Sequence, residues 1–148
     1  MHYLKKILKF HKSLIRNTYR KLLLKTDKKV FCVLFNFKSF ISKSSAHVSW
    51  KTDSFEVSDN FYPNIFYQFR HQRQGNMAYE SGFKKRADDL ADDYFLKKID
   101  FKNGDVFYDC GANTGDIMLW FNINNIDIEY IGFEPSPIEF ILLKQNIF

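Results

Sequence analysis

The chain has 148 residues, a formal net charge of +5, 45% hydrophobic residues and 26% charged residues. This length suits one ordinary domain with a packed core, and the composition is that of a soluble protein. The two cysteines, Cys32 and Cys110, lie 78 positions apart without CxxC or Cys/His spacing, which argues against a disulfide framework and a zinc site. We expect a cytoplasmic protein without a bound metal.

The charge is divided unevenly along the chain. Residues 1–51 contain 13 Lys or Arg residues against one acid, Asp27, whereas residues 52–148 contain 9 Lys or Arg residues against 16 acids. A basic segment therefore precedes a mildly acidic body. The predicted regions are a basic N-terminal extension over residues 1–50, an aromatic and helical region over residues 51–100, and a third region over residues 101–148.

The basic extension is predicted to contain an amphipathic helix over residues 3–24. Its apolar residues recur at helical spacing and basic residues fill the other faces. The apolar set is Leu4, Ile7, Leu8, Leu14, Ile15 and Leu22. Such a helix either packs its apolar stripe on the rest of the protein or makes a peripheral contact with an anionic membrane. Nucleic acid is not expected as a partner, because no set of stacking aromatic residues accompanies the charge.

Three predictions cover the middle of the chain. The apolar run around residues 30–37 is far below the about 20 residues of a membrane span and predicts a buried strand. Residues 54–74 are aromatic and are expected to be irregular, whereas residues 76–98 are expected to be helical. Lysines flank four aspartates in this helix, which predicts a solvated face with salt bridges and not a metal site. They are Asp88, Asp89, Asp92 and Asp93.

A glycine-containing turn follows a short apolar strand later in the chain. The strand is expected over residues 106–110, and Gly111 and Gly115 bracket the turn that leads into a helix over residues 116–121. Glycine lets the backbone turn sharply and approach a ligand closely, because it has no Cβ. Open α/β sheets bind ligands at this end of a strand.

A second strand is expected over residues 129–133, and Glu134 stands at its end. A carboxylate at this position can accept hydrogen bonds from both hydroxyls of a ribose. Strand, glycine turn, helix, strand and acid together predict a pocket for an adenosine-bearing cofactor.

The choice of cofactor follows from the turn. A dinucleotide fingerprint requires G-x-G-x-x-G, and the segment from Gly111 to Gly115 lacks the middle glycine. Asp116 would also place negative charge at the helix end where a pyrophosphate must rest. S-adenosyl-L-methionine (SAM) carries a sulfonium and an ammonium and has no phosphate, so acids around its pocket are tolerated. Electrostatics therefore favours SAM over NAD.

At these residues the chain resembles the FkbM family of SAM-dependent methyltransferases. The resemblance rests on Asp109-Cys-Gly-Ala-Asn-Thr-Gly-Asp116 and on Ile131-Gly-Phe-Glu-Pro-Ser-Pro137 with the helix that follows, and it covers roughly residues 101–148. It implies an α/β fold class, with the start of a class I (Rossmann-like) methyltransferase sheet. A mostly helical, basic N-terminal extension would precede that sheet.

The resemblance also implies a reaction and a cofactor site. The methyl group of SAM would pass to a sugar or small-molecule hydroxyl, in the biosynthesis of surface glycans. Asp109 and the turn would hold the methionine end of SAM, Glu134 would bind the ribose, and Pro135 would shape the pocket beneath the adenine. The implied cofactor-binding residues are Asp109, Gly111, Ala112, Asn113, Gly115, Asp116, Glu134 and Pro135. The resemblance assigns no general base.

A complete sheet of this class has seven strands, and the chain reaches the second. The resemblance therefore predicts that the chain is the N-terminal part of a longer methyltransferase, and that alone it is poorly stable and does not turn over substrate. Two alternatives remain open. The chain is a non-catalytic remnant that serves as a binding or scaffold module, or it belongs to another adenosine-cofactor enzyme such as an NAD oxidoreductase.

Overall fold

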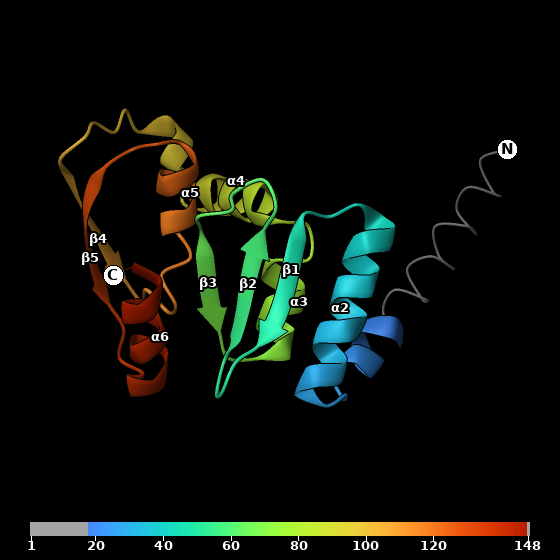
Figure 1. Ribbon diagram of the computed structural model, residues 1–148. Helices are drawn as coiled ribbons and strands as arrows, with labels where there is room; N and C mark the ends of the chain where they lie inside the picture. Colours follow the sequence, from blue (N-terminus) through green and yellow to red (C-terminus); the bar gives the residue numbers. More distant parts are fainter. Residues whose placement is uncertain (1–17, 148) are drawn as a thin grey trace, which may run out of the picture.

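Two small sheets organise the computed structural model, which describes residues 18–147 (Figure 1). The first sheet is antiparallel with strand order β1-β2-β3, and the second is a parallel pair. The strands are β1 (Ala46–Trp50), β2 (Phe55–Asp59), β3 (Phe66–Phe69), β4 (Asp105–Cys110) and β5 (Ile128–Phe133). The predicted α/β class is confirmed as a mixed α/β fold with one antiparallel and one parallel sheet.

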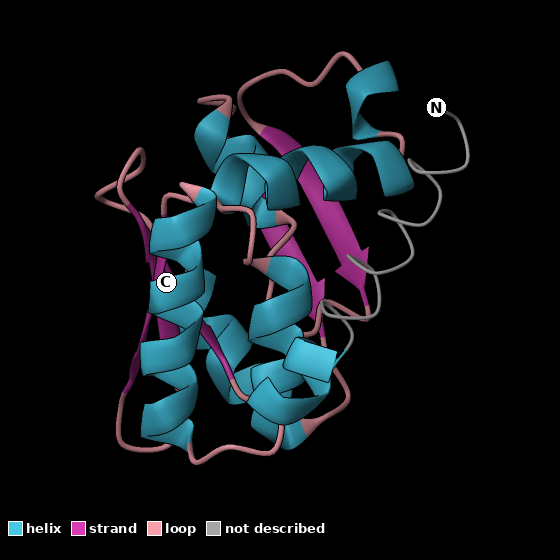
Figure 2. Ribbon diagram, turned by 90° about the vertical axis from the view of Figure 1, so that its right-hand side faces the viewer, coloured by secondary structure: helices cyan, strands magenta, loops and turns pink. Residues whose placement is uncertain are grey.

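Helices connect and cover these strands. Figure 1 places α2 at the end of the molecule opposite to β4 and β5, and Figure 2, which views that end, shows a surface made mostly of helices. The helices are α2 (Lys28–Ser42), α3 (Gln72–Ala78), α4 (Phe83–Asp93), the short 3-10 helix η1 (Leu96–Lys98), α5 (Met118–Ile123) and α6 (Pro137–Ile147).

The amphipathic helix predicted over residues 3–24 lies largely outside the described residues. Within the described part, residues 18–23 are helical. Leu23 is buried, and the Tyr19 hydroxyl donates to the Leu34 carbonyl of α2 at 2.9 Å. None of the described helices combines the length and the hydropathy of a membrane span.

The strand predicted over residues 30–37 is wrong, because this segment belongs to α2. The helix begins after Asp27, whose side chain accepts a hydrogen bond from the Lys29 amide, as an N-cap should. Phe31 and Phe35 are buried at helical spacing. Apolar residues also lie on the exposed face, and this hid the helical period in the sequence.

The irregular segment predicted over residues 54–74 is also wrong, because β2 and β3 lie within it. β2 pairs with β1 from Ala46↔Asp59 to Trp50↔Phe55, and with β3 from Phe55↔Phe69 to Ser58↔Phe66. Buried and more exposed residues alternate along β2, as in a sheet with one covered face. The β1–β2 hairpin therefore spans the boundary predicted near residue 50, and the division of the chain into three regions stays a prediction.

The core lies on the covered face of this antiparallel sheet. Side chains of the sheet meet side chains of α2, α3 and α4, and aromatic rings make up much of this core. The Phe55 and Phe69 rings stack at 5.2 Å, and Tyr79 lies 5.5 Å from Phe69. The same cluster continues to α5 through Trp120 and Phe121, so the two sheets share one core.

The helix predicted over residues 76–98 is divided into α3, α4 and η1. Gly82, with φ of +86°, is the N-cap residue before α4, and Asp59 holds the start of this helix in place. One Asp59 oxygen accepts from the Phe83 amide at 2.8 Å and from the Ser45 hydroxyl at 2.7 Å. A carboxylate is favourable at a helix N-terminus, because the first amides of a helix have no backbone partners.

The four aspartates of this segment form the solvated face that the sequence predicts. Lys84 pairs with Asp88 at 3.2 Å and Lys97 with Asp92 at 2.8 Å. Lys85 also pairs with Asp89. The described residues contain no group of three or more His, Cys, Asp or Glu side chains that could hold a metal ion.

The second sheet forms a parallel β4-α5-β5 unit, as the motif predicts. β4 and β5 pair in register from Asp105↔Ile128 to Cys110↔Phe133. The helix starts two residues later than predicted, at Met118. The carboxyl ends of both strands therefore lie side by side, and both predicted motifs meet at this edge.

Replacing Gly75 by alanine should destabilise the fold. A Cβ at Gly75 would overlap the ring of Phe69, which is fully buried and stacked on Phe55, so the ring cannot easily move. Alanine favours a helix by about 1 kcal/mol over glycine, but overpacking a core costs about 1–3 kcal/mol. Because the overlap is severe, the overpacking cost should fall in the upper half of this range, and we expect a net loss of about 1–2 kcal/mol in the free energy of unfolding, measured by urea denaturation.

Met77→Ala is the matched control for Gly75→Ala, since Met77 is exposed on the same helix. Its effect should stay within about 0.5 kcal/mol. Equal stability of the two variants would show that the core around Phe69 adapts to an added methyl group.

Candidate functional site

The turn between β4 and α5 has an unusual backbone. Three of its five residues have positive φ: Gly111 at +86°, Asn113 at +50° and Gly115 at +75°. The Gly111 and Ala112 amides both donate to the Phe133 carbonyl, at 2.8 and 3.0 Å. The turn is thereby attached to the end of β5.

Glu134 makes the second attachment between the turn and β5. One of its carboxylate oxygens accepts from the Asn113 amide at 2.8 Å, and the other accepts from the Ser136 amide at 2.7 Å. Each oxygen retains a further lone pair, so the carboxylate can still accept hydrogen bonds from a ligand. The position of Glu134 at the tip of β5 matches the sequence prediction.

Asp109 lies on β4 just before the turn and is oriented by β5. The Tyr130 hydroxyl donates to one Asp109 oxygen at 2.6 Å. Burial of the phenol raises the pKa of Tyr130, and the hydrogen bond to Asp109 and the negative charge of Asp109 raise it further. The phenol is therefore a hydrogen-bond donor at neutral pH. Among the described residues, the other Asp109 oxygen accepts no hydrogen bond from a side chain.

Asp116 ends the turn and pairs with Arg86 of α4. Nε and Nη2 of Arg86 donate to one Asp116 oxygen at 2.8 and 2.5 Å, and the two side chains are only 27% and 13% exposed. Burial alone would lower the pKa of Arg86, but the charge and hydrogen bonds of Asp116 outweigh it and raise the pKa. Arg86 therefore compensates the charge that Asp116 places at the start of α5.

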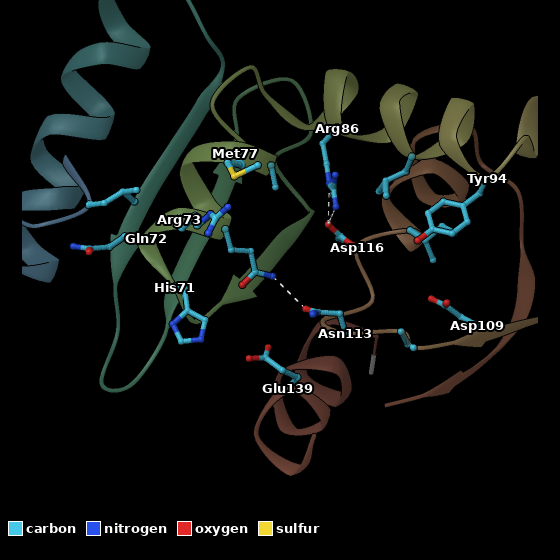
Figure 3. A pocket seen from close by; sticks show the side chains of 17 residues that line it. His71, Gln72, Arg73, Met77, Arg86, Tyr94, Asp109, Asn113, Asp116 and Glu139 are labelled. Carbon is cyan, nitrogen blue, oxygen red and sulfur yellow. Dashed lines mark hydrogen bonds and ion pairs between the residues drawn. The ribbon is translucent and has the colours of Figure 1, made fainter. Parts of the chain in front are cut away.

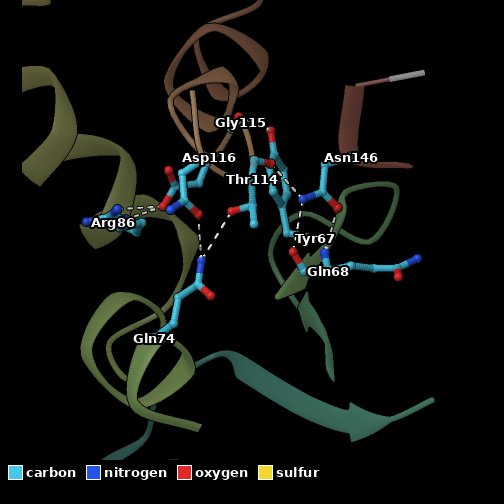
Figure 4. A network of polar contacts seen from close by, with 9 residues as sticks. Tyr67, Gln68, Gln74, Arg86, Thr114, Gly115, Asp116 and Asn146 are labelled. Carbon is cyan, nitrogen blue, oxygen red and sulfur yellow. Dashed lines mark hydrogen bonds and ion pairs between the residues drawn. The ribbon is translucent and has the colours of Figure 1, made fainter. Parts of the chain in front are cut away.

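Two amide side chains complete the support of the turn (Figure 4). From α6, Asn146 donates to the Thr114 carbonyl at 2.7 Å and exchanges two hydrogen bonds with the backbone of Gln68 on β3. From α3, Gln74 donates to the side chains of Asn113 and Thr114, both at 3.3 Å. The turn is thus held from β3, α3, α4, β5 and α6.

Two clefts open on either side of Gly111. The larger, of about 970 Å³, lies between α3, α4 and the turn and contains Asp109, Ala112, Asn113 and Asp116 (Figure 3). The smaller, of about 420 Å³, contains Glu134 and Pro135. Gly111 lines both clefts, and a Cβ there would meet no atom within 4 Å, so its positive φ is the feature that requires glycine.

Gly115 differs from the other predicted site residues in its surroundings. A Cβ at Gly115 would lie 2.7 Å from Leu143 and 2.9 Å from Ile147, both on α6. Its missing side chain therefore makes room for α6, and its positive φ closes the turn. It lines neither of the two clefts among the described residues.

Sequence reasoning missed the opposite wall of the larger cleft. This wall includes Arg73 and Gln74 of α3, His71 just before α3, and Arg86 of α4. The sequence assigns His71 no catalytic role, because no matching partner stands near it in His71-Gln-Arg-Gln74. No local signal identified these residues, since they reach the turn only when α3 and α4 fold against the β4-α5-β5 unit.

Comparison with known proteins gives one informative similarity. Over 53 residues the chain is 34% identical to 31-O-demethyl-FK506 methyltransferase FkbM from Streptomyces tacrolimicus. The matched segment is 36% of this chain and 20% of that protein. No family model and no solved structure matches the chain. The resemblance predicted from the two motifs is thereby confirmed as a relation to FkbM methyltransferase over part of the chain.

Removing the Arg86 side chain should destabilise the protein far more than removing its neighbour Lys85. Arg86→Ala leaves the Asp116 carboxylate mostly buried without its partner, and we expect a loss of about 1–3 kcal/mol in the free energy of unfolding. Lys85 forms an exposed pair with Asp89 on the same helix, so Lys85→Ala should cost less than about 0.5 kcal/mol. Denaturant unfolding measures both, and equal losses would contradict a supporting role for the Arg86–Asp116 pair.

Proposed function

We propose that the chain carries the cofactor site of a SAM-dependent methyltransferase of FkbM type. The partial similarity to an FkbM methyltransferase is the observation that carries this proposal. The chain spans about one fifth of that protein's length. The proposal therefore concerns the cofactor site first, and the methyltransferase activity of a whole enzyme is proposed from that site. The β4-α5-β5 unit would then begin a Rossmann-like sheet.

The residues of the site fit an elongated ligand with an adenosine at one end. Gly111 lies between the two clefts, and its lack of a side chain would let a ligand cross from one to the other. Glu134 and Pro135 would receive the ribose and adenine in the smaller cleft. Asp109 would face the ammonium group at the methionine end, in the larger cleft. Bound there, SAM would supply an electrophilic methyl group.

The chain's own residues would position this ligand through the turn. Asn113 and Ala112 line the larger cleft with their backbone held by Glu134 and Phe133. Tyr130 donates to one Asp109 oxygen and so fixes this carboxylate, which lines the larger cleft. Such preorganised groups lower the cost of binding, because they need not reorient when the ligand arrives.

The structure changes one argument against NAD. Asp116 was expected to repel a pyrophosphate, but Arg86 compensates its charge. Discrimination between SAM and NAD then rests on the missing middle glycine and on the similarity to a methyltransferase. NAD remains the second candidate ligand for this reason.

The acceptor is proposed to be a hydroxyl of a sugar or another small molecule. The related protein is named 31-O-demethyl-FK506 methyltransferase. That name indicates methylation of an oxygen atom, and this supports a hydroxyl as the acceptor group. The larger cleft is open and extends beyond the turn to His71 and Arg73, so an acceptor would approach from this side. An acceptor hydroxyl would need a base, and positioned bases within hydrogen-bond reach typically contribute about 10²–10⁴-fold in rate.

Calorimetric titration of the full chain with S-adenosylhomocysteine and with NAD tests the proposed cofactor. We expect S-adenosylhomocysteine to bind and NAD to bind at least about tenfold more weakly. Glu134→Gln should weaken S-adenosylhomocysteine about tenfold or more, because charge-assisted hydrogen bonds contribute about 1.5–3 kcal/mol.

Glu129→Gln is the matched control for Glu134→Gln, since Glu129 is an exposed glutamate on β5, the strand that Glu134 follows, and it lines neither cleft. It should leave the affinity unchanged. Thermal unfolding of each variant without ligand separates loss of binding from loosening of the turn. Tighter binding of NAD than of S-adenosylhomocysteine would replace the methyltransferase proposal by an oxidoreductase.

A further inference from the structure

The outer face of α2 carries an exposed apolar stripe that the proposed function does not use. Val33, Phe37, Phe40 and Ile41 are 67%, 61%, 81% and 65% exposed. They recur at helical spacing on the side opposite to the buried Phe31, Phe35 and Ser39. Large side chains gathered on one exposed helix face mark an interaction site more often than scattered ones do.

Lysines of α2 and of the segment before it bring positive charge to this end of the molecule, and among the described lysines of α2 Lys38 is paired with an acid, Glu80, at 2.6 Å. α2 contains no acidic residue, and the single acid of residues 1–51 is the N-cap Asp27. Lys21, Lys25, Lys29 and Lys43 are exposed, and no described acid lies within ion-pair distance of them. Residues 1–17 contain no Asp or Glu, so their sequence adds only positive charge.

The combination of apolar side chains and lysines selects among possible occupants. A second copy of the chain would bring two cationic helices together, and like charges at an interface are unfavourable. The phosphates of a nucleic acid would pair with the lysines, but Val33 and Ile41 would have no apolar partner. An anionic bilayer satisfies both, because its headgroups attract lysine and its acyl boundary receives the apolar side chains.

We propose that the outer face of α2 docks the protein on an anionic membrane surface. The stripe inserts Phe37 and Phe40 at the headgroup boundary, and the lysines around it contact the lipid phosphates. Figure 1 places α2 at the end of the molecule opposite to β4 and β5, so the candidate cofactor site stays open to water when α2 is docked. This inference does not depend on the proposed methyltransferase activity.

Co-sedimentation of the full 148-residue chain with vesicles tests the proposal. The vesicles contain phosphatidylcholine alone or phosphatidylcholine mixed with phosphatidylglycerol. We expect binding to the anionic mixture only, and weaker binding in about 1 M salt, where the Debye length falls to about 3 Å. Phe40→Ser should weaken binding about tenfold, because it removes one embedded aromatic side chain without changing the charge.

Phe61→Ser is the matched control, since Phe61 is 79% exposed but lies between β2 and β3. It should bind as the unmodified chain does. Lys29→Gln should weaken binding about fivefold, as expected for one surface lysine near anionic lipid. Lys102→Gln, at the other end of the molecule beside β4, should have no effect. Circular dichroism confirms that each variant keeps its helices.

Three results would overturn the proposal. The first is equal vesicle binding by the unmodified chain and Phe40→Ser, which would place any lipid contact elsewhere in the chain. The second is no binding to anionic vesicles at all. The third is a dimer in the absence of lipid that Phe40→Ser converts to a monomer, measured by light scattering, which would assign the stripe to a second copy.

Discussion

The ion pair between Arg86 and Asp116 joins the two halves of this structure. Arg86 belongs to the helices that cover the antiparallel sheet, and Asp116 ends the turn that follows β4. The pair is mostly buried, so neither charge is well solvated without the other. Its formation fixes the distance between α4 and the turn, and the larger cleft is the space that remains between them.

The turn itself requires this support. Positive φ at Asn113 costs energy that glycine would not incur, and such conformations persist where surrounding contacts fix them. Glu134, Asn146 and Gln74 reach the turn from three further elements. These contacts hold the amides and carboxylates of the turn in one arrangement. A ligand site benefits from this, because its groups need not be ordered when the ligand binds.

The charge distribution separates two surfaces that have different chemistry. The basic extension ends in a face of α2 that is both cationic and apolar, whereas the candidate site gathers Asp109, Asp116 and Glu134 at the other end. The core of the antiparallel sheet lies between them.

Two errors of sequence interpretation have the same origin. α2 has apolar residues on both faces, so the sequence hides its helical period and predicts a strand. In β2 and β3 buried residues alternate with more exposed ones, but the polar residues and Pro63 among the aromatic residues suggest an irregular segment. In both cases the pattern depends on which face is covered, and that is decided by packing partners elsewhere in the chain.

The sequence by itself determined the local structure of the β4-α5-β5 unit, because glycines, a short apolar strand and an acid at a strand tip act within about 30 residues. It also determined the salt-bridged face of α4, whose partners are four residues apart. Only the tertiary structure decided that Arg86, Gln74 and Asn146 support the turn. These residues lie 30 to 40 positions from their partners there, and contacts at such separation arise from packing, which no local pattern encodes.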